Sequence, residues 1–222
     1  MLTPAFGIVV GLAAEARIAH RLGCPVEIGG GTAEGAALAV QRLLAAGAGG
    51  VISFGLAGGL DPALRPGQVV VPTEVVTEDG RYDADPVLAV RFGGLTSHRL
   101  WGGEAIAASA AAKAALFARH GAQAIDLESG AVARAASARG VAFVAVRAIC
   151  DPAERDLPPV ALVALGASGG IGIWRVGLSL LRRPGQLPGL LALARDAAAG
   201  RRGLVEACRL AAPALRSADR QP

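Results

Sequence analysis

Residues 123–151, QAIDLESGAVARAASARGVAFVAVRAICD, decide the fold class of this 222-residue chain. They predict a strand over Gln123–Leu127, a helix over Glu128–Arg139 and a long buried strand over Val141–Ile149. The strands are largely apolar without strict alternation, which is typical of strands covered on both faces of a parallel sheet. This unit therefore favours an α/β fold, in which ligands lie at the carboxyl ends of strands.

The same alternation of strands and helices extends toward the N-terminus. We expect strands over Phe6–Val10, Gly50–Phe54 and Gln68–Pro72, and helices over Ala33–Ala46 and Glu104–Arg119. A mostly parallel sheet with helices on both faces accommodates these elements.

The composition excludes several classes of protein. Hydrophobic residues make up 53% of the chain and charged residues 18%, which excludes intrinsic disorder. Three cysteines without CxxC spacing and three scattered histidines predict neither a disulfide framework nor a metal site. Lys113 is the only lysine. The first apolar run has no basic residues before it, so we expect no signal peptide and a cytoplasmic protein.

Carboxyl side chains follow three of the predicted strands. Glu15 comes after the first strand, Asp126 and Glu128 flank the end of a later one, and Asp151 ends the most apolar strand, before Pro152. A carboxyl group at such a strand end is partly desolvated, which favours its protonated form and suits Asp151 to act as an acid. The alternatives are structural: a first-turn helix acid at Glu15, a helix cap at Asp126 and a turn at Asp151.

Glycines follow the strand predicted at Gly50–Phe54, in the sequence Gly55-Leu-Ala-Gly-Gly-Leu60. Such glycines let the backbone approach a ligand closely, with N–H groups free to bind an anion. The run is not the GxGxxG of dinucleotide-binding folds, and no acid follows at the distance that motif requires. A second cluster, Gly29–Gly31, is explained equally well by a turn.

Together these segments resemble the purine nucleoside phosphorylase superfamily. In chain order, the segments that carry the resemblance are Gly11…Glu15, Gly55–Leu60, Gly67–Pro72, Asp126–Glu128 and Arg147–Asp151. The resemblance spans residues 5–157 and is greatest to methylthioadenosine/S-adenosylhomocysteine nucleosidases. It implies a three-layer α/β fold with a central, mostly parallel mixed sheet flanked by helices. It also implies an enzyme that cleaves N-glycosidic bonds without a cofactor or metal.

The resemblance implies two catalytic residues. Asp151 matches the acid that protonates N7 of the leaving purine, and Glu15 matches the base that activates water. Phosphate-using members have a hydroxyl and often an arginine in the glycine-rich loop, where this chain has Leu56 and Ser53, so water is the favoured nucleophile. Inorganic phosphate stays the alternative co-substrate, because another arginine could supply the missing charge.

The resemblance also implies residues that bind the nucleoside. Glu128 matches the carboxylate that binds the ribose hydroxyls, and Leu127 stands where a methionine usually lies beneath the sugar. Base contacts are implied for Ile106, Ala107 and Gly58, with Ile106 at the place where an aromatic ring commonly stacks. The implied reaction is the release of adenine from a 5′-substituted adenosine.

The C-terminal part has a different character. Residues 160–174 carry no charge and are followed by Arg175. Residues 171–222 have a net charge of +6, against −2 for the rest of the chain. We expect two further helices, at Gln186–Ala199 and Arg201–Arg216. The chain is accordingly divided into a nucleoside phosphorylase-like catalytic domain (1–170) and a basic, apolar-helical extension (171–222) packed on or beside it.

Apolar residues beside arginines are typical of a surface that lies on anionic lipid. The alternative is a C-terminal helix that packs on the sheet, with a solvent-exposed segment beside it. With this tail the chain is most similar to hopanoid-associated phosphorylases. That resemblance implies a lipid-linked substrate, adenosylhopane, with residues 160–174 as a wall for its triterpenoid. The alternatives are a methylthioadenosine/S-adenosylhomocysteine nucleosidase and, outside the enzymes, a non-catalytic nucleoside-binding, membrane-associated protein.

The expected partners are few. The substrate is a small-molecule or lipid-linked adenosine, and we expect a homo-oligomer. Peripheral contact with the inner face of the membrane is expected through residues 171–222. No nucleic-acid partner is expected, because the basic charge comes without interleaved aromatics or a recognised nucleic-acid-binding module.

Overall fold

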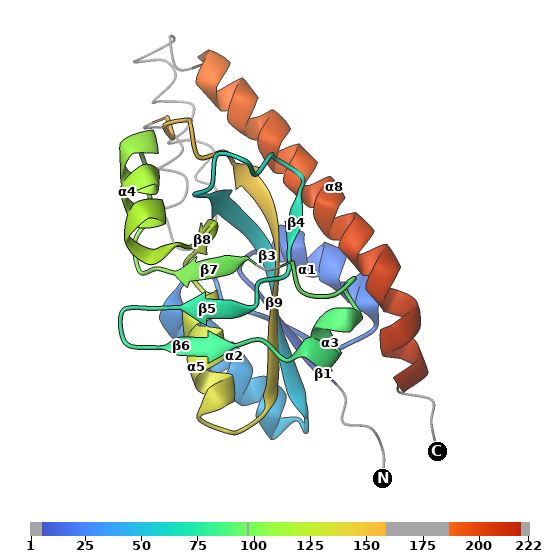
Figure 1. Ribbon diagram of the computed structural model, residues 1–222. Coiled ribbons are helices and arrows are strands. Elements are labelled where there is room, and N and C mark those ends of the chain that lie inside the picture. The colour runs from blue at the N-terminus through green and yellow to red at the C-terminus, as the bar shows by residue number, and fades with distance from the viewer. Residues whose placement is uncertain (1–5, 97, 159–186, 219–222) are drawn as a thin grey trace.

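The computed structural model describes residues 6–96, 98–158 and 187–218, which form a mixed sheet with helices on both faces (Figure 1). The main strand order is β2-β1-β3-β8-β7-β5-β6, and β9 pairs with both β3 and β4. The strands are β1 (Phe6–Val10), β2 (Val26–Ile28), β3 (Gly50–Gly59), β4 (Val69–Val70), β5 (Glu74–Val76), β6 (Arg81–Asp83), β7 (Arg99–Gly102), β8 (Ala124–Asp126) and β9 (Ala142–Asp151).

Most neighbouring strands run parallel. Parallel pairs are β1 with β2 and β3, β3 with β9, β5 with β7, and β7 with β8. The pairs β3–β8, β4–β9 and β5–β6 are antiparallel. The predicted mostly parallel mixed sheet is therefore confirmed.

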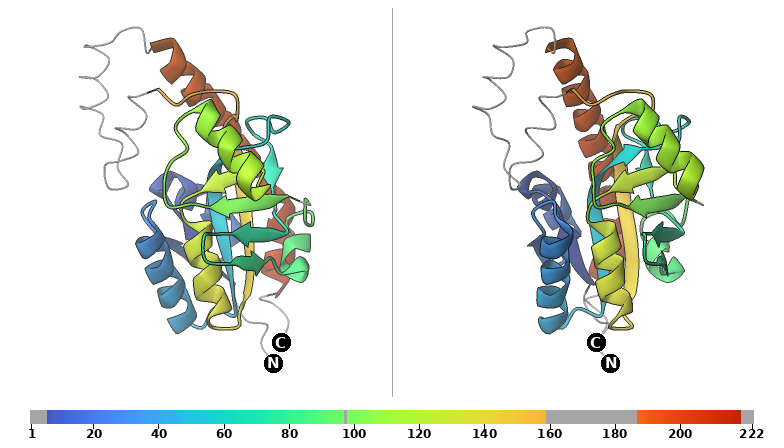
Figure 2. Two further views of the ribbon diagram at one scale, coloured as in Figure 1. Left: turned by 60° about the vertical axis from the view of Figure 1, so that its left-hand side comes forward. Right: turned by 90° about the vertical axis from the view of Figure 1, so that its left-hand side faces the viewer.

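Helices cover the sheet in layers. They are α1 (Ala13–Ala19), the 3-10 turn η1 (His20–Leu22), α2 (Ala33–Ala45), α3 (Pro86–Val90), α4 (Ala110–His120), α5 (Ser129–Ser137) and α8 (Leu187–Ala218). Helices α2 and α5 pack side by side on one face, α1 and α8 lie on the other, and α4 packs on β7 and β8 (Figure 2). The three-layer arrangement predicted from the sequence is thus confirmed.

Strand β3 changes partner along its length. Its first residues pair with β1 as far as Ser53, and its last two, Gly58 and Gly59, pair with β8. The other edge pairs with β9 from Gly50 to Gly58. The glycine-rich run was expected to be a loop, and that was wrong: pairing with β9 up to Gly58, and with β8 at Gly58 and Gly59, keeps it in the strand. One edge of the strand between Ser53 and Gly58 consequently lies beyond the end of β1.

The described part of the C-terminal segment is one helix, where the sequence predicted two. Helix α8 passes without a break through Gly200, because its glycines face the sheet at close range. A methyl group on Gly203 would lie 2.3 Å from the carbonyl oxygen of Gly67, and one on Gly200 would lie 3.1 Å from that of Ile149. Beyond the glycines, the buried face of α8 joins the core through Leu204, Ala207, Cys208, Ala211, Ala212 and Leu215.

Helix α4 begins later than predicted, at Ala110 instead of Glu104. The hydroxyl of Ser109 accepts a hydrogen bond from the N–H of Ala112 at 3.1 Å. The carboxylate of Asp156 accepts another from the N–H of Ala110 at 2.7 Å. These two acceptors satisfy N–H groups of the first turn, so the helix starts where they lie.

Candidate active site

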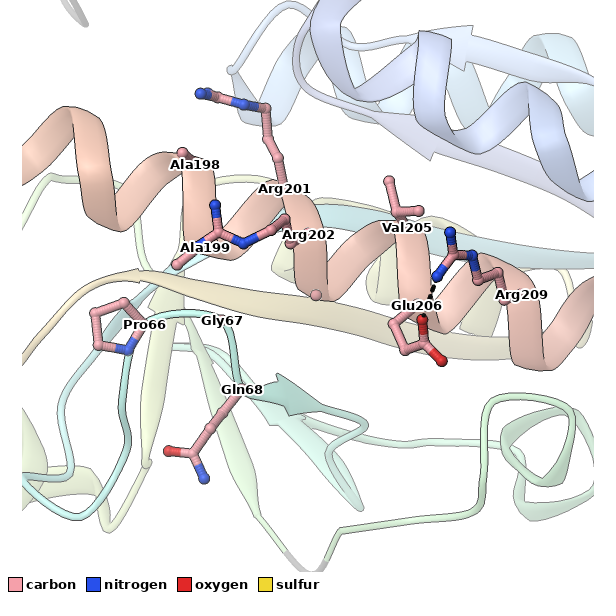
Figure 3. A pocket seen from close by; sticks show the side chains of 11 residues that line it. Pro66, Gly67, Gln68, Ala198, Ala199, Arg201, Arg202, Val205, Glu206 and Arg209 are labelled. Carbon is pink, nitrogen blue, oxygen red and sulfur yellow. Dashed lines mark hydrogen bonds and ion pairs between the residues drawn. The ribbon is translucent and has the colours of Figure 1, made fainter.

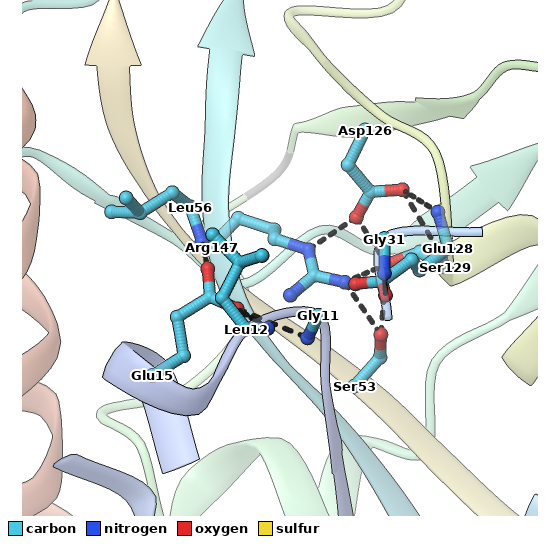
Figure 4. Close-up of polar contacts among 10 residues, drawn as sticks. All are labelled: Gly11, Leu12, Glu15, Gly31, Ser53, Leu56, Asp126, Glu128, Ser129 and Arg147. Carbon is cyan, nitrogen blue, oxygen red and sulfur yellow. Dashed lines mark hydrogen bonds and ion pairs between the residues drawn. The ribbon is translucent and has the colours of Figure 1, made fainter. Parts of the chain in front are cut away.

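The carboxylate of Glu15 lies where β3 passes the end of β1 (Figure 4). Glu15 is buried in the first turn of α1. Its Oε2 accepts hydrogen bonds from the N–H groups of Gly11 (3.0 Å) and Leu12 (2.9 Å), and its Oε1 accepts one from Leu56 of β3 (2.8 Å). The side chain therefore accepts hydrogen bonds from backbone N–H groups that strand pairing does not satisfy, and it places its carboxylate beside β3.

Glu128 lies against the same turn from the other side. It is buried at the start of α5, and its Oε1 accepts a hydrogen bond from the N–H of Gly31 at 3.0 Å. A methyl group on Gly11 would lie 2.7 Å from its Oε2. Burial, with smaller contributions from the carboxylates of Asp126 and Glu15, raises the pKa of Glu128 to about 7, against the attraction of a buried guanidinium.

That guanidinium belongs to Arg147, a wholly buried side chain of β9. Its Nε donates to Oδ2 of Asp126, and its Nη2 donates to the hydroxyls of Ser53 (2.6 Å) and Ser129 (2.9 Å). Asp126 in turn accepts from the N–H groups of Glu128 (3.1 Å) and Ser129 (2.9 Å), so it caps α5. Burial opposes the charge of Arg147, but the surrounding carboxylates, Asp126 foremost, outweigh it and raise the pKa of the guanidinium.

One nitrogen of Arg147 remains available. Its Nη1 is buried and has no hydrogen-bond partner within the described ranges. A methyl group on Gly55 would lie 2.7 Å from this nitrogen and 2.7 Å from Oε1 of Glu15. Because Gly55 has no side chain, the guanidinium and the carboxylate can both approach its Cα more closely than a methyl group would allow.

Asp151 ends β9 and is 8% exposed. Its Oδ2 lies 2.7 Å from Nζ of Lys113, which is wholly buried in α4. Burial raises the pKa of Asp151, and the hydrogen-bonded ion pair with Lys113 opposes that rise without cancelling it. A raised pKa is what a carboxyl group needs to carry a proton closer to neutral pH.

Strand β3 connects Asp151 with Glu15. A methyl group on Gly58 would lie 3.6 Å from Oδ2 of Asp151, and Leu56, two residues earlier, donates its N–H to Glu15. Two residues of a strand span about 7 Å. The carboxylates of Glu15 and Asp151 consequently lie along one stretch of β3, and Glu128 lies across Gly11 from Glu15.

The structure places the other predicted residues as follows. Gly58 lies beside Asp151, and Leu127 is half-buried between β8 and α5. Ile106 is 36% exposed, whereas the neighbouring Ala107 is buried against the cluster of β7 and β8. Their contacts with a base or a sugar stay predictions.

Sequence reasoning missed the roles of two cations. Arg147 was noticed only as part of a motif, although an arginine inside so apolar a strand requires a buried partner. Lys113 was noticed only as the single lysine, yet it contacts Asp151. Asp126, in contrast, accepts a hydrogen bond from the N–H of Ser129 at the start of α5, as the capping interpretation predicted, although the N-cap position itself is Glu128.

A wide groove of about 930 Å³ lies away from these acids (Figure 3). It runs between residues 66–68 and α8, and its charged lining is Arg201, Arg202, Glu206 and Arg209. Glu206 and Arg209 pair with each other at 3.1 Å, and Arg201 and Arg202 are exposed. The groove holds none of the predicted catalytic residues.

Two negative findings apply to the described residues alone. They contain no group of three or more His, Cys, Asp or Glu side chains arranged to hold a metal ion. None of the helices formed by residues 6–96, 98–158 and 187–218 has the length and apolarity to cross a membrane. The predicted apolar wall at 160–174 lies outside the described residues.

Comparison with known proteins points to one family. The family model described as "Phosphorylase superfamily" matches residues 24–94 and 93–164, which is more than half of the chain. No curated protein matches the chain by sequence.

Solved structures share the fold at low sequence identity. Futalosine hydrolase of Helicobacter pylori is 14% identical with a TM-score of 0.70, covering 96% of this chain and 98% of its own. The S-adenosylhomocysteine nucleosidase of Streptococcus pyogenes, in complex with 5-methylthiotubericidin, is 20% identical (TM-score 0.63; 69% and 86% covered). The 5′-methylthioadenosine/S-adenosylhomocysteine nucleosidase of Neisseria meningitidis, in complex with methylthio-immucillin-A, is 17% identical (TM-score 0.64; 91% and 97% covered).

Proposed function

The chain belongs to the phosphorylase superfamily, and from this premise we propose that it hydrolyses the N-glycosidic bond of a 5′-substituted adenosine and releases adenine. Membership makes the chain an enzyme of N-glycosidic bond cleavage; the nucleoside and the nucleophile are the proposed parts. The observation that carries the proposal is the grouping of Glu15, Glu128 and Asp151 around the end of β1 and the last half of β3.

Asp151 is proposed as the acid. When the bond between C1′ and N9 breaks, its electron pair goes to the adenine, and a proton on N7 neutralises the developing negative charge. Burial keeps the carboxyl group of Asp151 protonated to a higher pH than usual. General acid catalysis of this kind contributes a rate factor of roughly 10² to 10⁴.

Water is proposed as the nucleophile, with Glu15 as its base. The oxocarbenium-like sugar is attacked at C1′ by the water oxygen, and the proton released passes to Glu15. Support comes from the approach of Oε1 of Glu15 and of the unpartnered Nη1 of Arg147 to the same residue of β3, Gly55. A phosphate anion there would face the carboxylate of Glu15, which is unfavourable in a buried site. The hydroxyl of Ser53 is already bonded to Arg147.

Glu128 is proposed to bind the ribose. Its carboxylate can accept hydrogen bonds from the 2′ and 3′ hydroxyls, and its negative charge stabilises the positive sugar in the transition state. Its backbone position is fixed by the N–H bond to Asp126. Leu127 is proposed beneath the sugar, and Ile106, Ala107 and Gly58 around the base.

For the 5′ substituent we propose the triterpenoid of adenosylhopane. Support comes from the sequence: residues 160–174 are uncharged and largely apolar, and the resemblance to hopanoid-associated phosphorylases includes the basic tail. A methylthio or homocysteine substituent is the second candidate, favoured by the fold shared with nucleosidases that are named for those substrates.

The C-terminal extension, residues 171–222, is proposed to contact anionic lipid at the inner face of the membrane. Its helix α8 exposes Arg201 and Arg202, and Leu191 and Leu210 are 51% and 60% exposed. Guanidinium groups attract anionic headgroups, and exposed apolar side chains add affinity. The test is pelleting with anionic vesicles. The proposal is supported if the Arg201→Glu/Arg202→Glu variant no longer pellets while Arg42→Glu pellets as the wild type does. It is refuted if the double variant pellets as well as the wild type.

Product analysis tests the reaction. Purified protein is incubated with methylthioadenosine, S-adenosylhomocysteine and adenosylhopane, each with and without phosphate. We expect adenine and a free reducing sugar at a rate independent of phosphate, with adenosylhopane turned over fastest. A sugar 1-phosphate would show phosphate to be the nucleophile, and adenosine binding without adenine release would favour a non-catalytic protein.

A further inference from the structure

The ammonium group of the single lysine of the chain has three oxygen atoms within 3 Å. Lys113 is 0% exposed in the alanine-rich helix α4. Its Nζ lies 2.7 Å from Oδ2 of Asp151 and donates to the carbonyl oxygens of Pro152 (2.9 Å) and Arg155 (2.8 Å). Burying a charge is costly unless it is paired, and an ammonium has three hydrogens. The surroundings of Lys113 match that number.

The contact leaves the two oxygens of Asp151 unequal. Oδ2 is held by Lys113, whereas Oδ1 has no hydrogen bond to any residue of the ranges 6–96, 98–158 and 187–218. A carboxyl group held at one oxygen has lost most of its rotational freedom, which orients the other oxygen toward a ligand. The proton that Asp151 donates is therefore carried on Oδ1.

Helix α4 and the residues just before it hold the segment after Asp151 at further points. Asp156 accepts a hydrogen bond from the N–H of Ala110 at 2.7 Å, and the N–H of Leu157 donates to the carbonyl of Ala108 at 2.8 Å. Residues 103–108, which lead into α4, include Ile106 and Ala107, two of the three predicted base-contacting residues. The acid is thus fixed relative to the segment proposed to hold the base.

Other charged groups also face Asp151. Arg155, on the following loop, lowers the pKa of the carboxyl group, and Asp196 of α8 raises it; these two side chains form an ion pair with each other. The neighbouring thiol of Cys150 has its pKa raised to about 12 by burial, so it is uncharged. Lys113 is the cation in direct contact, and its effect on the acid exceeds that of Arg155.

We propose that Lys113 is a positioning residue for the acid: it fixes Oδ2 of Asp151, turns Oδ1 toward N7 of the base, and stabilises the carboxylate that remains after proton transfer. In that step the Oδ1–H bond breaks, the N7–H bond forms, and the electron pair of the C1′–N9 bond goes to adenine. Asp151 is left as an anion in contact with the ammonium of Lys113, and solvent later returns the proton. The inference rests on the proposed function.

The pH profile of adenine release distinguishes this role from a structural one. Activity requires protonated Asp151, so it falls as pH rises through the pKa of that group. Lys113→Met keeps the length of the side chain and removes its charge, which lets the pKa of Asp151 rise. We expect the alkaline limb of kcat/KM to move up by about one pH unit or more, and kcat to fall about 10²-fold. KM should stay within about threefold.

Asp156→Ala is the matched control, because it removes a tie between the same loop and α4 without touching Asp151. It should lower the melting temperature and leave the alkaline limb in place. Lys113→Arg keeps the charge of the side chain but not its shape. Its kcat should fall, but the alkaline limb of kcat/KM should lie at the same pH as in the wild type. If the alkaline limb of kcat/KM stays in place in Lys113→Met, and kcat falls no more than in Asp156→Ala, the role of Lys113 is structural only and the proposal is wrong.

A second measurement does not depend on any substitution of Lys113. In the untagged chain, 15N-lysine labelling gives one side-chain NMR signal, because Lys113 is the only lysine. The proposal predicts that this signal shifts in a step at the pH of the alkaline limb, and that Asp151→Asn abolishes the step. A signal constant across that range would overturn the proposal. Failure of the proposed function is a separate result: no adenine would be released from any nucleoside, whatever the lysine signal does.

Discussion

Arg147 and Glu15 approach the same point of β3 and form no ion pair with each other. The methyl group that Gly55 lacks would lie 2.7 Å from Nη1 of the arginine and 2.7 Å from Oε1 of the glutamate. Three backbone N–H groups hold the glutamate, and Asp126 with two serine hydroxyls holds the arginine. Each charged group is thus held by other partners, and Nη1 of Arg147, without a partner among the described residues, stays free to bind the water that Glu15 is proposed to activate.

Glu15→Gln should abolish most of the hydrolysis. The amide cannot accept the proton of water, so kcat should fall by roughly 10² to 10⁴ while the nucleoside still binds. Stability should fall by about 1–3 kcal/mol, because the amide nitrogen cannot accept a backbone N–H. Adenine release and urea unfolding measure the two effects.

Glu34→Gln is the control for that substitution, because Glu34 is exposed in the first turn of α2. It should leave both quantities unchanged. Hydrolysis by Glu15→Gln at more than a tenth of the wild-type rate would remove Glu15 from the role of base.

Glu128 should make the protein less stable as pH rises toward 7. Its folded-state pKa, about 7, lies above its ordinary value of 4.5, so the folded state holds a proton that the unfolded state has released between these values. The stabilising contribution is complete below pH 4.5 and is lost as pH rises through 7. Glu128→Gln removes this dependence, and it should be the more stable protein at pH 8 by on the order of 3 kcal/mol.

Urea unfolding of the wild type and Glu128→Gln at pH 5 and pH 8 measures that difference. If the difference in unfolding free energy between the wild type and Glu128→Gln is the same at pH 5 and pH 8, the raised pKa of Glu128 is contradicted. The Glu128→Gln enzyme should also show a higher KM than the wild type, since the proposed contact with the ribose hydroxyls is weakened.

The close packing of α8 on the sheet depends on Gly203. Gly203→Ala would bring a methyl group to 2.3 Å from the carbonyl oxygen of Gly67, so the helix must shift. We expect a loss of about 1–3 kcal/mol of unfolding free energy. Gly189→Ala, in the same helix, meets its nearest neighbour at 3.8 Å and should be neutral or stabilising by up to about 1 kcal/mol. Equal effects of the two substitutions would contradict the packing described for α8.

The sequence predicts the long buried strands well and misses several short ones. Strand β1 has the expected bounds and β9 nearly so, because apolar residues dominate both. Strands β4 and β8 were expected but are shorter than predicted. Strands β2, β5 and β6, of three residues each, were missed because so few residues give little hydrophobic pattern. The uninterrupted helix α8 was unexpected because the contacts that favour glycine at 200 and 203 come from distant parts of the chain.

The site shows the same limit. Three acids were found because each follows a strand, and the resemblance to a family ordered their roles. Arg147 and Lys113 could not be assigned, since their partners lie far away in sequence: Ser53 is 94 residues from Arg147, and Pro152 is 39 from Lys113. Pairing of buried charges across such distances is set by sheet topology, which the order of elements alone does not specify.

The central claim, that Asp151 gives a proton to the departing adenine, is tested most directly by Asp151→Asn. Asparagine preserves the shape and removes the acidic proton, so the rate of adenine release should fall by roughly 10² to 10⁴ with nucleoside affinity within about threefold. Asp156→Asn, five residues along the same loop and exposed, should act at the wild-type rate. Release by Asp151→Asn within tenfold of wild type would contradict the account.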